Sequence, residues 1–286
     1  MAEVSASMVK ELREMTGAGI LECKNALAEA EGVLDRAADI LREQGIAKQI
    51  KKADRAANEG TVVALVSNDG KTGSIIQLNC ETDFVAINDK FKAYAERIAN
   101  IALDTQAADV DALKAASDGN ETVEEIITDC VRVLGENTQL TKVASVNADG
   151  VCAYIHAGGK IGVLVTFELE GIDPGSDAFT AYGRDVAMQV AAMSPVAANR
   201  ENVPADVVEH EMAIYKAQAA ESGKPEEIQQ KMAEGRLEKF YKESCLTEQE
   251  FVKNPDMTIK SYTEQIAQNM GGTIKVVDFI RFALGE

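Results

Sequence analysis

Apolar residues recur three and four positions apart in the first 45 residues, in three short stretches separated by glycines. This spacing is typical of the buried face of an amphipathic helix, and glycine is a common helix stop. We therefore predict three short helices in a small bundle, the first capped by Ser5 or Ser7. The basic segment KQIKKADR at 48–55 is expected to be a linker or an exposed helix. The repeated positions are Val9, Leu12 and Met15, then Ile20, Cys23 and Leu27, then Val33, Ala37, Ile40 and Leu41.

From residue 60 the pattern changes to that of β-strands, and the same pattern returns near residue 150. GTVVALVSNDGKTGSIIQL (60–78) and GVCAYIHAGGKIGVLVTF (150–167) each predict a strand, a tight glycine turn and a second strand. The amphipathic run FKAYAERIANIA (91–102) matches FTAYGRDVAMQVA (179–191). A helix that ends at Leu134-Gly135 before a strand likewise matches one that ends at Met270-Gly271. Each copy is therefore predicted to contain strand, strand, helix, helix and strand, which makes a duplicated α+β core with antiparallel sheets.

The second copy is longer than the first. Phe91 to Gly135 spans 44 positions, whereas Phe179 to Gly271 spans 92, a difference of 48. The extra sequence contains two helical stretches joined by SGKP, which predicts an inserted helical hairpin. A thin pair of helices cannot bury both of its faces, so we interpret the hairpin as a dimerisation or docking arm. A solvated lid over its own core is the alternative.

These patterns divide the chain into five parts. We expect a three-helix domain with a basic linker at 1–56, a first core subdomain at 57–147, and a second core subdomain at 148–203 and 241–257. The inserted coiled-coil hairpin is expected at 204–240, and a C-terminal module that completes the core at 258–286.

The composition restricts the class of partner. With 46% hydrophobic and 27% charged residues among 286, the chain is predicted to be globular. Its net charge of -18 disfavours nucleic acid and anionic membrane and favours a partner with basic or apolar surface. The five cysteines have no CxxC spacing, which indicates reduced thiols and a cytoplasmic location. Since we find no apolar run of membrane-spanning length and no signal peptide, neither is expected.

The motifs of catalysis are missing from the sequence. Both Gly-Lys pairs, at 70–71 and 159–160, lie in predicted hairpin turns and lack the remaining residues of a phosphate-binding loop. The two histidines, His156 and His210, have no cysteine or carboxylate at the spacing of a metal site. We therefore expect no cofactor and no metal, and a binding protein rather than an enzyme.

The connection CETDFVAIND (80–89) carries an aromatic residue, Phe84, between a predicted strand and a predicted helix. The second copy has an ordinary turn there, Gly171-Ile172-Asp173-Pro174, so the scaffold does not require the ring. Two interpretations stay open. The ring is tucked beneath its own helix, or it protrudes as a wedge, which would contribute ~1.5–3 kcal/mol when buried in a partner. In the second case the Asp83 carboxylate would orient the wedge by bonding exposed backbone amides.

At these residues the chain closely resembles the bacterial elongation factor Ts family, the guanine-nucleotide exchange factors of the GTPase elongation factor Tu. The resemblance rests on KELREMTGAGILECKNAL, TDFVA, LGEN and HAGGKIGVLV, with SGKP and EGRLEKF in the hairpin, and it covers nearly the whole chain. It implies an N-terminal ubiquitin-associated-like (UBA-like) three-helix domain, a two-subdomain core, a hairpin that forms a homodimer, and a C-terminal module that closes the core.

The resemblance also implies which residues contact elongation factor Tu, on its GTPase domain and a second domain. Asp83 and Phe84, within the motif from Thr82 to Val85, would meet the switch side of the GTPase domain, and Lys24 would add a contact from the N-terminal domain. Leu134 and Gly135 stand where the family usually has Ile-Gly. His156 matches the histidine after the copy-two strand, and Val252 stands where the family often has FVM, with Lys253 replacing the methionine.

The resemblance implies a mechanism that needs no catalytic acid or base. Phe84 would enter a pocket between two helices of the GTPase domain and displace the elements that hold magnesium and the phosphates, so that GDP leaves and GTP binds. Two alternatives remain from other classes: an adaptor that uses its three-helix domain to hold another chain, and an enzyme with an unrecognised site.

Overall fold

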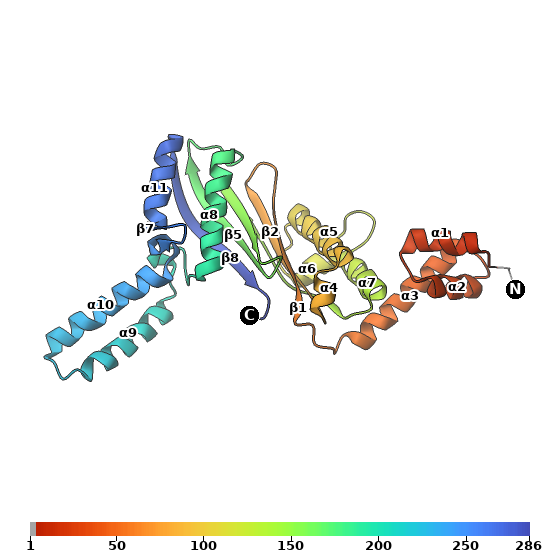
Figure 1. Cartoon of the computed structure of the whole chain (residues 1–286), viewed down its shortest axis with the longest axis horizontal. Coiled ribbons are helices and arrows are strands. Elements are labelled where there is room, and N and C mark those ends of the chain that lie inside the picture. Colours follow the sequence, from red (N-terminus) through yellow and green to blue (C-terminus); the bar gives the residue numbers. More distant parts are fainter. Residues whose placement is uncertain (1–3) are drawn as a thin grey trace.

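The computed structural model describes residues 4–286, apart from the side chains of 46–51, and the molecule is elongated (Figure 1). A body of three helices lies at one end, two sheet-containing modules lie in the middle, and a pair of helices projects at the other end. Among the described residues, no helix has both the length and the apolar character needed to span a membrane.

The N-terminal body contains α1 (Ala6–Thr16), α2 (Ile20–Glu29) and α3 (Leu34–Lys52). The Ser5 hydroxyl caps α1 by accepting a hydrogen bond from the backbone N–H of Met8, and Gly17 ends the helix at a φ of 66°. The predicted apolar stripes meet in its core, where Leu12, Cys23, Leu27 and Leu41 are buried.

Helix α3 continues past Gly45, where the apolar pattern ends, and takes in most of the basic segment at 48–55. Gly45 lies within the helix because the absence of a side chain allows close packing against α7 (Val123–Leu134). A Cβ there would lie 3.3 Å from the Thr128 side chain. A glycine ends a helix only when the backbone turns there, and this tertiary contact favours the straight continuation.

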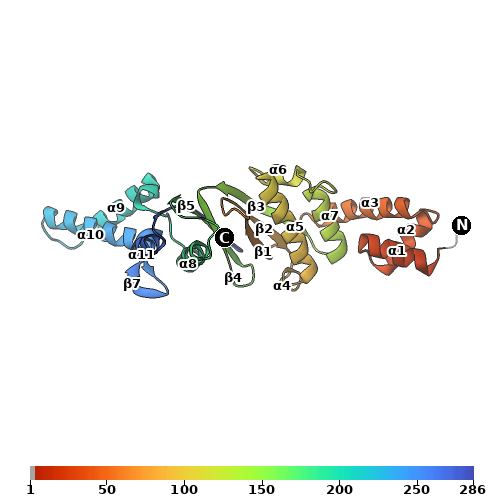
Figure 2. The ribbon, with the colours of Figure 1, turned by 90° about the horizontal axis from the view of Figure 1, so that it is seen from above.

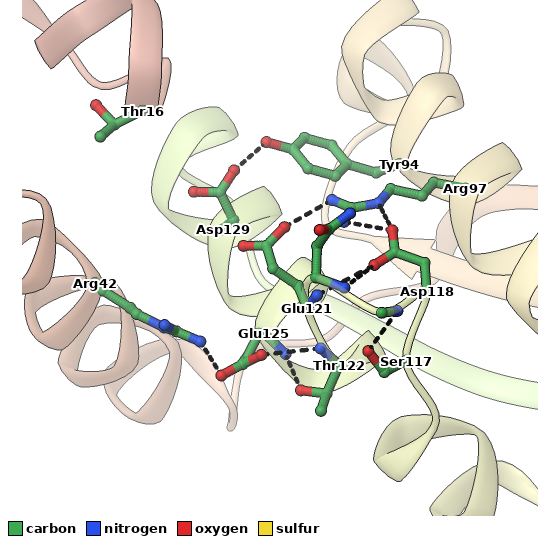
Figure 3. A network of polar contacts seen from close by, with 12 residues as sticks. Thr16, Arg42, Tyr94, Arg97, Ser117, Asp118, Glu121, Thr122, Glu125 and Asp129 are labelled. Atoms are coloured by element: carbon green, nitrogen blue, oxygen red, sulfur yellow. Dashed lines mark hydrogen bonds and ion pairs between the residues drawn. The ribbon is translucent and has the colours of Figure 1, made fainter.

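Polar side chains join the N-terminal body to α7 (Figure 3). The buried Arg132 guanidinium donates to the backbone oxygen of Thr16 at the end of α1 and to the Asp129 carboxylate. Arg42 of α3 pairs with Glu125. Because α7 belongs to the first sheet module, these contacts fix the bundle to the core.

The first module contains β1 (Glu59–Val66), β2 (Thr72–Cys80), α4 (Asp83–Ala86), α5 (Asp89–Thr105), α6 (Val110–Ala115), α7 and β3 (Thr138–Asn147). Its strands form an antiparallel sheet in the order β1-β2-β3. The second module contains β4 (Gly150–His156), β5 (Ile161–Glu170), α8 (Asp177–Met193), α11 (Ile259–Met270) and β8 (Thr273–Ala283), with the antiparallel order β4-β5-β8.

The two modules share the same order of main elements and equivalent strand registers, which confirms the predicted duplication. Helices α5 and α8 both have 17 residues, and α7 and α11 both have 12. Each module has one β-bulge at the same place, between Gln77 and Leu78 in β2 and between Thr166 and Phe167 in β5. A bulge of this kind is an inherited feature of a sheet rather than an accident of packing. The short helix α6 has no counterpart in the second module.

The two sheets pack face to face and make one continuous core. Val62 and Ile75 of the first sheet contact Val151 and Leu164 of the second. Gly73 and Gly162 occupy equivalent positions at this interface, and a Cβ on either would approach a valine of the other sheet to 2.7 Å or less. These two glycines lie within β2 and β5, just after the hairpin turns, and they allow the sheets to approach each other.

The insertion in the second module forms the predicted hairpin, which projects away from the sheets instead of covering them (Figure 1). Its helices pack on each other, with Ala219 and Ala233 buried between them. At its base, Arg200 pairs with Glu238 and Glu248. The insertion contains η1 (Arg200–Asn202), α9 (Ala205–Ala220), α10 (Glu226–Ser244), η2 (Leu246–Glu248), β6 (Glu250–Phe251) and β7 (Asn254–Thr258).

Candidate protein-binding surface

The Phe84 side chain points outward and is 79% exposed. It lies on α4, a single helical turn in which Val85 and Ala86 pack against the core of the first module. Residues three apart share one side of a helix, so Ile87, 67% exposed, extends the same apolar surface. This geometry excludes the interpretation in which the ring is tucked beneath its own helix.

Thr82 serves as the N-cap of this turn, and its side chain is used within the chain. Its hydroxyl accepts from the backbone N–H of Val85 at 3.4 Å and donates to Glu136 Oε1 at 2.6 Å. Asp83 is exposed at the first position of the turn. Its carboxylate makes no hydrogen bond to the other described residues, so it is available to an incoming protein.

Leu134 and Gly135 end α7 directly beside α4. Leu134 is half-buried and packs against the first core, whereas Gly135 is exposed in a left-handed conformation with a φ of 80°. The next residue, Glu136, reaches across to Thr82. Residues about 50 positions apart in the sequence therefore form one surface with Phe84.

His156 is exposed at the end of β4, and its Nδ1 shares a hydrogen bond of 3.0 Å with the Tyr154 hydroxyl. The turn that follows packs on β1, where the Val62 N–H donates to the Gly159 oxygen at 2.7 Å. The first half of β1 pairs with the end of β2 that leads into α4. The turn after His156 and the connection that carries Phe84 therefore both lie near the first half of β1.

Val252 is exposed in the turn between β6 and β7, and its backbone N–H donates to the buried Gln189 side chain at 2.9 Å. Lys253 beside it pairs with Asp185 at 2.6 Å, so its ammonium is bound within the chain. Figure 2 shows α4, the end of β4 and the β7 hairpin on the same long side of the molecule. Lys24 is exposed on α2 in the N-terminal body, apart from this group.

The chain is similar over nearly its whole length to proteins of one family. The sequence model of the family described as Elongation factor TS matches residues 81–286. Elongation factor Ts of Clostridioides difficile (strain 630) is 46% identical over 288 residues, covering 100% of this chain and 94% of its own. That of Trichlorobacter lovleyi is 44% identical over 289 residues, covering 99% of this chain and 93% of its own. The chain belongs to the elongation factor Ts family. Its role is that of a translation elongation factor.

Several residues of this surface could not be singled out from the sequence. Ile87 follows TDFVA directly, and its exposure depends on α4 being a single turn. Glu81 and Glu136 are surface-type residues, yet Glu81 accepts from the Asn137 N–H at 2.7 Å and Glu136 accepts from the Thr82 N–H at 3.0 Å. The sequence gives one indication of their role, which is that each glutamate lies next to a residue of the surface. Glu81 precedes Thr82, and Glu136 follows Gly135.

Elsewhere a cleft of about 1060 Å³ lies between the base of the hairpin, α11 and β8. Its lining carries lysine, arginine and glutamate side chains, several of them paired, as Arg200 is with Glu248. The described residues contain no group of three or more histidine, cysteine, aspartate or glutamate side chains arranged to hold a metal ion.

Proposed function

We propose that this protein binds elongation factor Tu with bound GDP and promotes GDP release, with Phe84 as the wedge. The observation that carries the proposal is a phenylalanine 79% exposed on a helical turn whose other side is packed into a core. A large apolar side chain held outward at a fixed point suits insertion into a partner's pocket. Burying the ring would contribute ~1.5–3 kcal/mol.

The free energy of this contact acts through linkage. If the wedge fits only when the magnesium-binding and phosphate-binding elements are displaced, binding of this protein and binding of nucleotide weaken each other by the same factor. GDP then leaves faster, and GTP refills the site and releases the exchange factor. No proton is transferred to or from this chain, so no acid, base or metal is required of it, and the protein is not an enzyme.

The remaining contacts are proposed from the same surface. Asp83 would orient the wedge on backbone amides of the partner, and Val85 would support it from the core side. Leu134 and Gly135 would contact the GTPase domain beside Phe84, and Lys24 would contact it from the N-terminal body. His156 and Val252 lie farther along the same long side, so they would meet the partner, including its second domain.

The proposal also covers the organisation of the chain. Residues 1–56 would form a UBA-like domain with its linker, and residues 204–240 would form a dimerising hairpin. The core would comprise a first part at 57–147, a second part at 148–203 with 241–257, and a C-terminal part at 258–286. No nucleic acid or membrane partner is proposed, since the chain carries a net charge of -18. The corresponding location is the cytoplasm.

Phe84→Ala tests the wedge. Release of a fluorescent GDP analogue from elongation factor Tu is followed by stopped flow, and the variant should slow it about tenfold or more, because ~1.4 kcal/mol corresponds to a factor of ten. Met193→Ala is the matched control, since Met193 is also an exposed apolar residue but lies outside the proposed surface. Its release rate should equal that of the unmodified protein. An unchanged rate for a folded Phe84→Ala protein contradicts the wedge and favours the adaptor.

The dimer is tested separately by deleting 205–240 and joining the ends with a short glycine linker. The apolar side chains between α9 and α10 are already buried or half-buried, so dimerisation would use the outer residues, including Ile214 and Ile228, which are exposed. Sedimentation should give a dimer for the full chain and a monomer for the deletion. A full chain that sediments as a monomer at micromolar concentration argues against the homodimer.

A further inference from the structure

We propose that Glu136 is a positioning residue that holds the turn carrying Phe84 in its outward orientation. The inference extends the proposed function, because it assigns a role to a residue that need not touch the partner. It comes from the contacts between two loops that are far apart in sequence, the connection after β2 and the connection after α7.

The two loops are joined by reciprocal carboxylate contacts. Glu136 accepts from the Thr82 backbone N–H at 3.0 Å and from the Thr82 hydroxyl at 2.6 Å. Glu81 accepts from the Asn137 backbone N–H at 2.7 Å, in the opposite direction. Hydrogen bonds to an ionised carboxylate are stronger than bonds between neutral groups. We call these two residues the carboxylate clamp.

The clamp acts on α4 through its N-cap. The Thr82 hydroxyl that donates to Glu136 also accepts from the Val85 N–H, so its rotation is set from both sides. A one-turn helix has almost no stability of its own and depends on caps and packing. With Thr82 fixed, Val85 and Ala86 face the core, and Phe84 faces away from it.

The second module shows what happens without this carboxylate. The equivalence of α7 and α11 and of their terminal glycines places Gly272 where the first module has Glu136. A Cβ at Gly272 would lie 2.3 Å from the backbone oxygen of Glu170, so no side chain fits there. Gly171 stands where the first module has Thr82, and the connection forms no helix. The module that lacks the exposed aromatic also lacks the Glu136 contact.

The counterpart of the Glu81 contact is retained in the second module. Glu170 occupies the position of Glu81 and accepts from the Thr273 hydroxyl at 3.3 Å. Because both modules have this contact, closure of the sheet is enough to explain the glutamate at position 81. The half made by Glu136 is specific to the module that presents Phe84.

The test observes the turn directly, without any partner. The chain contains no tryptophan, so Phe84→Trp introduces a single tryptophan on α4, which can be excited selectively over the six tyrosines. Time-resolved anisotropy of this tryptophan reports its local motion. Replacing Glu136 by alanine in the Phe84→Trp protein should raise the amplitude of the fast depolarisation about twofold or more, because the N-cap is released. Glu136→Gln keeps one acceptor oxygen and should give an intermediate value.

Two further variants complete this measurement. Thr82→Val removes the hydroxyl while keeping the shape of the side chain, and it should reproduce most of the effect of Glu136→Ala. Glu168→Ala is the matched control, because it removes an exposed carboxylate paired with Lys275 at 2.9 Å on the second module. Its anisotropy should be unchanged. An unchanged anisotropy in both Glu136→Ala and Thr82→Val overturns the inference. If one of these two variants fails to fold, the other still gives the result.

Nucleotide release then separates this inference from the proposed function. With Phe84 present, Glu136→Ala should slow release about fivefold, the equivalent of one hydrogen bond of ~1 kcal/mol. With Phe84→Ala, the same change should add no further slowing, since both act through one ring. Equal slowing in both backgrounds overturns the positioning role. If Glu136→Ala makes the tryptophan mobile but Phe84→Ala leaves the release rate unchanged, the positioning role of Glu136 is supported and the wedge is refuted.

Discussion

The connection after β2 and the connection after β5 occupy the same place in two copies of one fold, yet only the first presents an aromatic ring. The first forms a helical turn capped by Thr82, whereas the second is a turn at Gly171 and Asp173 in which Ile172 packs against the core. The first connection, 81–88, has 8 residues between β2 and α5, whereas the second, 171–176, has 6 between β5 and α8.

The difference shows how a duplicated scaffold separates folding from binding. Both copies retain the residues that close the sheet and pack the helix, including Phe91 and Phe179, which are fully buried. In the connection itself, the first copy differs by the exposed Phe84 and by Thr82, which caps its turn. Changes at equivalent positions of the two modules should therefore act alike on stability and differently on exchange.

The largest effect is expected from emptying the two cores. Phe91→Ala and Phe179→Ala should each lower the free energy of unfolding by about 3–5 kcal/mol. Phe179 should cost more, by about 0.5–1.5 kcal/mol, because its ring packs edge-on against Phe167 with centroids 5.2 Å apart. Phe91 has no such ring neighbour among the described residues. Urea unfolding measures both values, and an equal loss would show that the aromatic cluster adds nothing beyond burial.

A smaller effect is expected at the two helix ends that share a left-handed glycine. Gly135 and Gly271 have φ values of 80° and 75°. A Cβ on Gly135 would meet only the Lys52 ammonium, at an ordinary contact distance of 4.0 Å, and a Cβ on Gly271 would meet nothing. Alanine at either position should therefore cost about 1–2 kcal/mol of stability, because the strain is in the backbone. Only Gly135→Ala should also slow nucleotide release, since Gly271 lies outside the proposed surface. Equal slowing by both variants would remove Gly135 from that surface.

At neutral pH the smallest effect is that of the buried thiols, because their ionisation matters only in alkaline solution. Burial raises the pKa of Cys80 and Cys130 in the first module, and of Cys152 in the second, to about 12 from an ordinary value of 9.0. Below the ordinary value both states keep the proton, and the stabilising contribution is fully present. Above pH 9 the thiols ionise in the unfolded chain but stay protonated in the folded one. The free energy of unfolding therefore falls between about pH 9 and about pH 12, and each thiol contributes up to about 1.4 kcal/mol per pH unit to this fall.

Urea unfolding from about pH 8 to about pH 10 measures this slope. Cys130→Ala should flatten it by the share of one thiol, even though the substitution also lowers stability at every pH. Cys152→Ala should flatten it by the same share, which makes the second module the internal control. A slope unaffected by either substitution would mean that these thiols do not ionise in the unfolded chain over this range.

Local sequence rules predicted the elements well and their ends less well. The three N-terminal stripes, the two strand pairs and the inserted hairpin follow from apolar periodicity and from glycine and proline at the turns. The third helix exceeds its pattern by passing through Gly45, where the contact with α7 is decisive. Helix α6 was missed because it has only 6 residues, too few to show a period.

The sequence by itself determined the class of fold, the duplication and the unusual position of Phe84, because these depend on spacing along the chain. Whether the ring points inward or outward could not be predicted from spacing, since a residue on a single turn has no periodic neighbours. Tertiary structure decided it by packing Val85 inward and bringing Glu136 to Thr82 across more than 50 residues. A contact between distant loops depends on the folded sheet, and no local pattern encodes it.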